Sequence, residues 1–324
     1  MPQSRKNQIN LAATPYYHCI SRCVRRAFLC GVDENSGQSY EHRRQWVEDK
    51  LFKLSKIFTI DVCAYAVMSN HTHTVLHVDE QQAKALNTKE ILIRWHQIFK
   101  GTFLTQKYIN KEPLNKSELT AVEIISNVYR QRLVSISWFM RVLNESIARE
   151  ANKEDGCTGR FWEGRFKSQA LLDESALAAC MVYVDLNPIR ASIAKTPETS
   201  DYTSIKLRIK HALNKKQPSQ LMPFVGNPER EQSKGLAFDI KEYIALVDFT
   251  GRNIRNNKSG FINQKRPNIL KRLSINEEKW ITLSKHFTNI FHGAVGSEDS
   301  LSQFCEFHHK KRRTNISNSQ TFFS

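Results

Sequence analysis

The feature that most restricts how this chain folds is a pair of apolar stretches separated by only two residues. The first, "FTIDVCAYAVM" at 58–68, is rich in β-branched and aromatic residues, and the second, "HTHTVLHV", occupies 71–78. Between them stands Ser69-Asn70, a dipeptide suited to a tight turn. Two such stretches around a short polar turn are typical of adjacent antiparallel strands. We therefore expect a β-hairpin over 58–78.

The second strand of this hairpin carries three histidines at even spacing, His71, His73 and His77. Side chains alternate between the two faces of a strand, so all three should point to the same side of the sheet. A face of this kind can bind a metal ion, or it can simply be exposed to water. The histidines alone do not decide between these two interpretations.

Further elements follow from the spacing of apolar residues along the chain. A strand is expected over 15–23, and residues 159–172 should begin as a loop and end as a strand. Helices are expected over 40–57, 87–101, from about Ser117, and over 135–152, 174–187, 236–249 and 276–292. Asp173 should cap the helix at 174–187, and Pro188 should stop it, because the residue before a proline avoids helical geometry.

The strongest compositional feature is the positive charge. The formal net charge is +16 and the isoelectric point is near 9.6. A chain of this kind favours a polyanionic partner, because neutralising phosphates releases bound counterions. No basic amphipathic helix with a strongly apolar face stands out, so nucleic acid is favoured over an acidic membrane surface.

The same sequence favours a cytoplasmic protein. The longest clearly apolar stretch, "ALAACMVYV" at 176–184, is too short to cross a bilayer, and the polar N-terminus lacks the apolar core of a secretory signal. The seven cysteines are scattered, which is typical of reduced thiols. The spacing of Cys19, Cys23 and Cys30 differs from that of zinc sites.

A possible partner for the histidines lies on the helix expected at 174–187. Tyr183 and Asn187 stand four residues apart, so they should share one helical face. Imidazole nitrogens of His71 and His73, with the amide oxygen of Asn187, form a ligand set that suits Mg²⁺ or Mn²⁺ with open positions for a phosphate oxygen. Tyr183 is then a candidate nucleophile toward a phosphodiester.

These residues resemble a known family. "MSNHTHTVLHV" (68–78) and "YVDLNPIRA" (183–191) are similar to the single-tyrosine HUH transposases, most of all the REP-associated tyrosine transposases. "YYHCISRCVRRAFL" (16–29) and "GRFWEGRFKS" (159–168) resemble two further segments of that family. Thr72 departs from the pattern, because the family usually has a larger apolar residue between the two histidines.

The resemblance implies a fold and an activity. The implied fold is α+β, with an antiparallel sheet flanked by helices, in a catalytic domain over 10–214 that carries an insertion at 79–134. The implied activity is metal-dependent nicking and strand transfer on hairpin-containing single-stranded DNA. In it Tyr183 is the nucleophile that forms a 5′-phosphotyrosine, and His71, His73 and Asn187 are the ligands of Mg²⁺ or Mn²⁺. The assembly is left open between a monomer and a homodimer.

Outside the catalytic domain, composition predicts the remaining organisation. The proline-rich, polar stretch at 215–235 is expected to be a linker. Residues 236–300 are expected to form a helical, basic accessory region, and 301–324 a flexible polar tail.

Basic residues that alternate with aromatic ones suggest a path for single-stranded DNA, because phosphates bind cations and bases stack on flat rings. Two alternatives remain open: in one, Trp162 belongs to a loop that is held by aromatic packing, and in the other, the basic run at 252–272 is a solvated surface. On the helix of Tyr183, Asp185 is expected to be exposed to solvent. The candidate DNA contacts are Arg22, Arg25, Arg26, Arg160, Trp162, Arg165, Lys167, Arg252, Arg255 and Lys258.

A second hypothesis is a binding protein that holds structured nucleic acid without cutting it. Thr72 and the large C-terminal region motivate this alternative.

Overall fold

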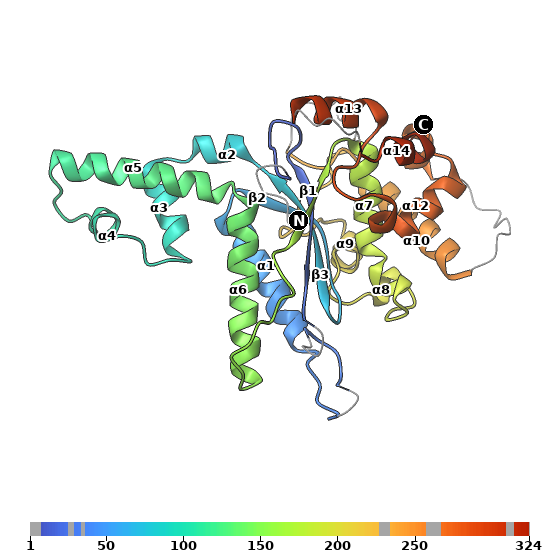
Figure 1. The fold of residues 1–324 in the computed structure, drawn as a ribbon, viewed down its shortest axis with the longest axis horizontal. Coiled ribbons are helices and arrows are strands. Elements are labelled where there is room, and N and C mark those ends of the chain that lie inside the picture. The colour runs from blue at the N-terminus through green and yellow to red at the C-terminus, as the bar shows by residue number, and fades with distance from the viewer. Residues whose placement is uncertain are drawn as a thin grey trace.

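The sheet at the centre of the protein has four antiparallel strands. The computed structural model describes residues 8–24, 29–33, 36–226, 234–256, 267–308 and 314–323. The strands, in the spatial order β2-β3-β1-β4, are β1 (Tyr16–Arg22), β2 (Ile60–Val67), β3 (His71–Val78) and β4 (Lys167–Leu171). Helices flank the sheet on both sides (Figure 1), so the fold is α+β, as expected.

The predicted hairpin is confirmed. Strands β2 and β3 pair from Ile60 opposite Val78 to Val67 opposite Thr72, with one register shift between Val62 and Ala64. Strand β1 lies between β3 and β4 and pairs with both. The predicted strand at 15–23 is therefore a central strand of the sheet, and the segment after the 159–166 loop is the edge strand β4.

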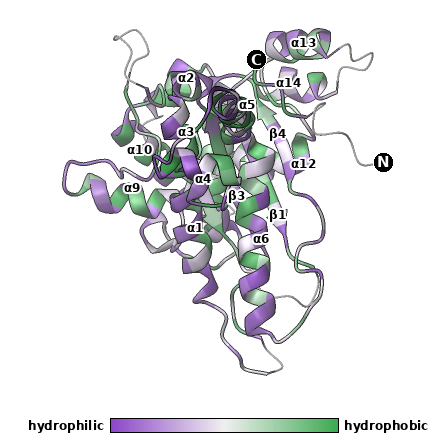
Figure 2. Cartoon of the chain, turned by 90° about the vertical axis from the view of Figure 1, so that its left-hand side faces the viewer, coloured by the Kyte–Doolittle hydropathy of each residue, from purple (hydrophilic) through white to green (hydrophobic). Residues whose placement is uncertain are grey.

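One face of the sheet is covered by α1 (Arg43–Ile57) and α6 (Ile136–Glu154). The predicted apolar stripe of α6 is buried against the strands, while the far end of this helix is largely hydrophilic (Figure 2). Thr72 faces this side, as its alternation with the histidines requires, and only 3% of it is exposed. The departure from the family pattern at this position therefore lies in the core and not in the histidine face.

The opposite face is covered by α7 (Glu174–Asp185), which Asp173 caps by accepting a hydrogen bond from the backbone N–H of Ala176. Contrary to the prediction, Pro188 is not the residue that ends the helix. The helix is interrupted at Leu186 and continues as the short α8 (Asn187–Arg190), with Pro188 in its first turn. A proline is tolerated there because the first N–H groups of a helix have no partner in the helix anyway.

The helices described after residue 236 are α10 (Ile240–Asn256), α11 (Asn268–Arg272), α12 (Glu277–Ile290), α13 (Glu298–Phe307) and α14 (Ile316–Phe322). Of these, α10 and α12 pack on the outer side of α7. The apolar side chains of α10 and α12 belong to the same buried cluster as those of α7 and strand β2. The C-terminal region therefore shares a core with the sheet; the division into a catalytic domain and an accessory region stays a prediction.

Two other segments differ from what composition suggested. In the expected linker, the N–H of Met222 donates to the carbonyl of Val62 on β2 at 2.8 Å, and Leu221, Met222 and Phe224 are buried. The described residues of the expected tail include most of α13 and all of α14, and α13 buries Leu301, Phe304 and Cys305. Both segments contain enough apolar side chains to attach to the core, despite their polar average.

Residues 79–134 form a lateral arm that projects from the sheet (Figure 1). It consists of α2 (Glu80–Ala85), α3 (Thr88–His96), α4 (Phe103–Ile109) and α5 (Lys116–Leu133). The remaining helices in the described residues are α9 (Ser204–Ala212) and the 3₁₀ turn Pro197–Thr199. Within the described part of the chain, no helix combines the length and the apolar character needed to cross a membrane.

Asp185, expected to be solvated, is fully buried at the end of α7. Its carboxylate accepts hydrogen bonds from the hydroxyls of Ser204 and Tyr243 and from the N–H of Ile205. Tyr243 belongs to α10, so this one carboxylate connects α7, α9 and α10. The helical wheel that predicted exposure ignored the C-terminal helices, which cover this side of α7.

Candidate functional site

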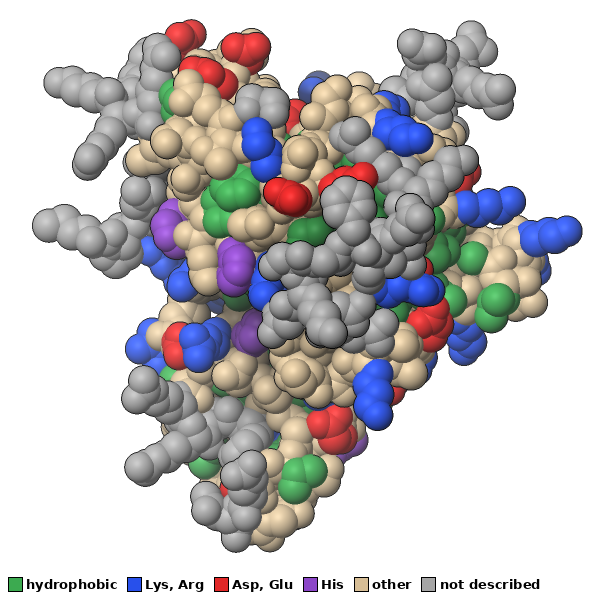
Figure 3. All heavy atoms as spheres, turned by 90° about the vertical axis from the view of Figure 1, so that its right-hand side faces the viewer, with side chains coloured by type: hydrophobic (Ala, Val, Ile, Leu, Met, Phe, Trp, Pro, Cys, Tyr) green, Lys and Arg blue, Asp and Glu red, His purple; other side chains and the backbone are tan. Residues whose placement is uncertain are grey.

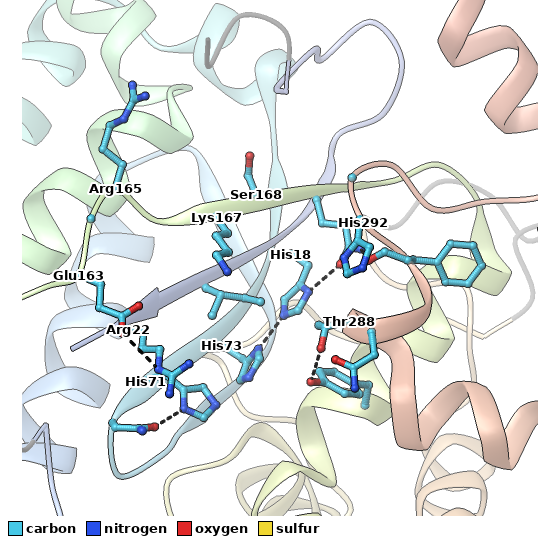
Figure 4. A pocket seen from close by; sticks show the side chains of 18 residues that line it. His18, Arg22, His71, His73, Glu163, Arg165, Lys167, Ser168, Thr288 and His292 are labelled. Atoms are coloured by element: carbon cyan, nitrogen blue, oxygen red, sulfur yellow. Dashed lines mark hydrogen bonds and ion pairs between the residues drawn. The ribbon is translucent and has the colours of Figure 1, made fainter. Parts of the chain in front are cut away.

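A cavity of about 850 Å³ opens where β1, β3 and β4 face α7 and the end of α12 (Figure 4). Its walls are polar and basic. Figure 3 shows the face formed by the C-terminal helices, on which histidine side chains lie beside lysine and arginine side chains. The residues that line it include His18, Arg22, His71, His73, Arg165, Lys167, Gln169, Tyr183, Thr288 and Phe291.

Strand alternation brings His71 and His73 to the cavity side of β3, as predicted, with ring centroids 4.9 Å apart. The central strand β1 adds a third ring, His18, whose Nε2 lies 2.8 Å from Nδ1 of His73. The three rings stand in a row across the two strands (Figure 4). His77 lies outside the cavity lining, where its Nδ1 is 2.9 Å from the Asp61 carboxylate.

All three rings are neutral at physiological pH. Burial lowers the pKa of His18 to about 4, and the charge of Arg190 acts in the same direction. Burial and the charges of Arg22 and Arg190 lower the pKa of His71 to about 4. The pKa of His73 also lies well below its usual value, because the ring is buried beside two other imidazoles. Neutral imidazoles keep a lone pair, which is the form that binds metal ions.

Tyr183 reaches the same cavity from α7. Its ring centroid lies 5.7 Å from that of His73 and 6.2 Å from that of His18. Tyr183 therefore packs beside His73, and His71 lines the same cavity.

The phenol of Tyr183 is held by groups that the sequence did not single out. Its oxygen is 2.9 Å from the hydroxyl of Thr288 on α12, and its ring packs against Phe287. On another side, the guanidinium of Arg190 stands 3.7 Å from the ring centroid and donates to the carbonyl of Tyr183 at 2.8 Å. Burial lowers the pKa of Arg190 to about 10, so this side chain remains a cation at neutral pH.

Asn187 is not among the residues that line the cavity, and a turn at Leu186 separates it from the helix that carries Tyr183. Its side-chain nitrogen is buried without a hydrogen-bond partner. Turning the amide by 180° would place its oxygen at this position, because the two ends of an amide are interchangeable in shape. Its role as a metal ligand stays a prediction.

The donors present are compatible with a divalent cation. Nε2 of His73 is buried and has no partner, and the neutral ring of His71 lines the same cavity. Across the described ranges, no group of three or more His, Cys, Asp or Glu side chains is arranged to hold a metal. A cation at the two histidines would therefore need an amide oxygen, water or substrate oxygens as further ligands.

Three of the predicted DNA contacts, Arg22, Arg165 and Lys167, line the cavity. Arg22 is also 3.7 Å from the carboxylate of Glu163. The exposed Arg160 lies outside the lining, and so does Trp162, whose indole N–H donates to the carbonyl of Asn144 at 2.8 Å. This contact fits the alternative of a loop held by aromatic packing.

The remaining basic residues are placed elsewhere or not described. Arg252 is exposed on α10 and pairs with Asp248, outside the cavity lining. Arg25, Arg26 and Lys258 lie outside the described residues, as does the side chain of Arg255.

Sequence reasoning missed His18, Arg190 and Thr288. His18 stands four residues before Arg22 on the first strand, so strand alternation predicts that both side chains point to the same face of the sheet. The sequence does not show that His73 is the residue next to His18 in space. Arg190 stands in the quoted segment "YVDLNPIRA". For Thr288, which is 105 residues from Tyr183, the sequence contains no local signal.

Comparisons with known proteins add little beyond the fold. No protein-family model matches the chain, and no curated protein matches it. One solved structure that is similar is described as "Structure of the REP associates tyrosine transposase bound to a REP hairpin". It is 12% identical, covers 72% of this chain and 98% of its own, and has a TM-score of 0.37. A likeness of this strength does not assign an activity.

Proposed function

We propose that this protein is a single-tyrosine transposase that nicks and rejoins hairpin-containing single-stranded DNA. The observation that supports this most is the meeting, in one basic cavity, of Tyr183 from α7 with His71 and His73 from β3. A phenol beside two neutral imidazoles and several cations suits attack on a phosphodiester.

The proposed reaction exchanges one phosphate ester for another. The phenol oxygen of Tyr183 attacks phosphorus, the bond from phosphorus to the 3′ oxygen breaks, and a 5′-phosphotyrosine forms. In the net reaction the proton of the phenol ends on the released 3′-hydroxyl. No water is consumed, so a second 3′-hydroxyl can reverse the step and join a new strand.

Each nearby side chain has a task in this proposal. Arg190 holds the Tyr183 ring in place, because its guanidinium stacks on the ring and donates to the backbone carbonyl of the same residue. Arg22, Arg165 and Lys167 hold backbone phosphates at the mouth of the cavity. His71 and His73 would hold Mg²⁺ or Mn²⁺, and Asn187 would complete the ligand set only if its side chain moved into the cavity. Such a cation supplies charge stabilisation at the scissile phosphate.

The test uses the full-length protein, Mn²⁺ or Mg²⁺, and single-stranded hairpins taken from the DNA that flanks the gene. We expect a strand labelled at its 3′ end to become covalently attached to the protein. A strand labelled at its 5′ end should shorten and end in a hydroxyl that a polymerase can extend. Peptide mass spectrometry should place the nucleotide on Tyr183; attachment to another residue would contradict the proposal.

A second candidate, a protein that binds structured nucleic acid without cutting it, is favoured by two observations. The hydroxyl of Tyr183 is already bonded to Thr288, and Asn187 is absent from the cavity lining. Tight binding of the same hairpins without metal, and with no adduct on any of them, would support this candidate over the enzyme.

The basic cavity wall leads to a separate prediction about affinity. Lys167→Ala and Arg165→Ala should each weaken binding to single-stranded DNA. Each should reduce the slope of log affinity against log salt by about 0.7, the value for one phosphate contact. Fluorescence anisotropy at several salt concentrations measures both quantities.

Arg252→Ala is the matched control, because Arg252 is an exposed arginine that pairs with Asp248 outside the cavity. An unchanged slope is expected for this variant. An equal loss at Arg252 would mean that the DNA path extends over α10 and is not confined to the cavity.

A further inference from the structure

Three polar side chains, Gln169, His18 and His73, form a hydrogen-bonded row that begins at the backbone of Phe291. Nδ1 of His18 lies 3.2 Å from the side-chain oxygen of Gln169 on β4, and Nε2 of His18 lies 2.8 Å from Nδ1 of His73. Gln169 and His18 are at most 8% exposed and His73 is 2% exposed, so water does not replace these contacts. His18 and His73 appear as neighbours in Figure 4.

The hydrogen bond between Gln169 and Phe291 decides which atom donates and which accepts in each contact of the row. The side-chain nitrogen of Gln169 donates to the backbone carbonyl of Phe291 at 2.7 Å. An amide turned the other way would place two acceptor oxygens against each other at that distance. The oxygen of Gln169 therefore faces His18, and because this oxygen only accepts, Nδ1 of His18 must donate.

The proton position on His18 then determines the proton position on His73. A neutral imidazole has one N–H and one lone pair, so His18 with a proton on Nδ1 can only accept at Nε2. Nδ1 of His73 must therefore donate to His18. Since His73 is neutral as well, its Nε2 carries the lone pair, and this is the buried atom that has no partner.

We propose that Gln169 and His18 are positioning residues that fix the tautomer of His73 and thereby leave Nε2 available as a metal ligand. This inference rests on the proposed function, because that function gives His73 a cation to hold. It also gives the C-terminal segment a role in the site, since the carbonyl of Phe291 sets the direction of the whole row.

Asn70 fixes the tautomer of His71, the other proposed metal ligand, through a single hydrogen bond. Its side-chain oxygen lies 2.6 Å from Nδ1 of His71, which leaves Nε2 of that ring with the lone pair. Metal-binding histidines ordinarily donate their other ring N–H to a partner, and loss of the partner typically weakens metal affinity about 10–100-fold.

The first measurement reads the tautomer directly, without metal or DNA. In the full-length protein with ¹⁵N-labelled histidine, long-range ¹H–¹⁵N correlation spectra should show His73 protonated at Nδ1 and bare at Nε2. The spectrum of His73→Gln identifies its signals. A proton on Nε2 of His73 would overturn the proposal even if the protein cuts DNA.

The second measurement separates tautomer control from packing. His18→Gln keeps an oxygen that accepts from His73 and an N–H that donates to Gln169, whereas His18→Phe keeps the ring that packs on Phe287 and Tyr183 but has no polar atom. We expect Mn²⁺ affinity, measured by electron paramagnetic resonance, to fall about 10–100-fold in His18→Phe and to be largely retained in His18→Gln. A purely packing role predicts the opposite order.

His77→Phe is the control, because His77 lies on the same strand but outside the cavity and pairs with Asp61. It should leave Mn²⁺ affinity unchanged. If no DNA adduct ever forms while the tautomer and the order of affinities are as expected, the proposed cutting activity fails and the positioning role stands.

Discussion

Tyr183→Phe is expected to abolish the covalent protein–DNA adduct while the fold and DNA affinity are retained. The substitution removes one oxygen and leaves the ring in its contacts with Arg190 and Phe287. Stability should change by only about 0.5–1.5 kcal/mol, the usual net value of one lost hydrogen bond, here the bond to Thr288. Adduct formation should fall by a factor on the order of 10⁴ or more, because no other nucleophile replaces the phenol.

The measurement is a denaturing gel of the 3′-labelled hairpin, read beside an anisotropy titration of the same DNA. Tyr16→Phe is the matched control. Tyr16 lies on β1, two residues from His18, but outside the cavity lining and against His77. An adduct that persists in Tyr183→Phe, or that is lost equally in Tyr16→Phe, would reject Tyr183 as the nucleophile.

The second large effect concerns stability. Asp185→Ala should lower the free energy of unfolding by about 3–5 kcal/mol, the usual cost of removing one partner from a buried charged network. The hydroxyl of Tyr243 and the N–H of Ile205 would lose their acceptor, and the charge of the buried Arg208 would lose its counterion. Denaturant unfolding followed by circular dichroism gives this value.

Asp201→Ala is the comparison for this experiment. Asp201 is exposed and pairs with Lys206, so its loss should cost no more than about 0.5 kcal/mol. Equal small effects of the two substitutions would show that α7 is not held in place by its terminal carboxylate.

The same carboxylate predicts a pH dependence. Burial raises the pKa of Asp185 to about 6, against the opposing hydrogen bonds from Ser204 and Tyr243 and the charge of Arg208. Because the folded state then binds the proton more tightly than the unfolded state, this group's contribution to stability falls as pH rises from about 4 to about 6. Asp185→Asn should remove that contribution, so the difference between the unfolding free energies of the two proteins should vary with pH only in this window.

Much of the secondary structure was readable from the sequence because its signals are local. The hairpin of β2 and β3 followed from two apolar stretches around Ser69-Asn70, and the span of α6 from its apolar stripe. Alternation along β3 was enough to place His71 and His73 on one face, apart from Thr72. Such patterns involve neighbours within a few residues, where backbone geometry alone fixes the direction of each side chain.

The prediction for Asp185 was wrong for a tertiary reason. Helical geometry, taken alone, turned Asp185 toward water. In the structure α10 covers this side of α7, and its Tyr243 donates to the buried carboxylate. A helical wheel describes one isolated helix, and it contains no information about what packs against it.

By itself, then, the sequence determined that a strand with two inward-facing histidines and a tyrosine-bearing helix exist. Only the tertiary structure decided what completes the site: His18 beside His73 through the register of β1 and β3, Thr288 on the phenol, and the carbonyl of Phe291 behind Gln169. The physical reason is the distance along the chain. Contacts between residues 55 to 122 positions apart depend on strand register and on the docking of whole helices, and no local periodicity encodes either.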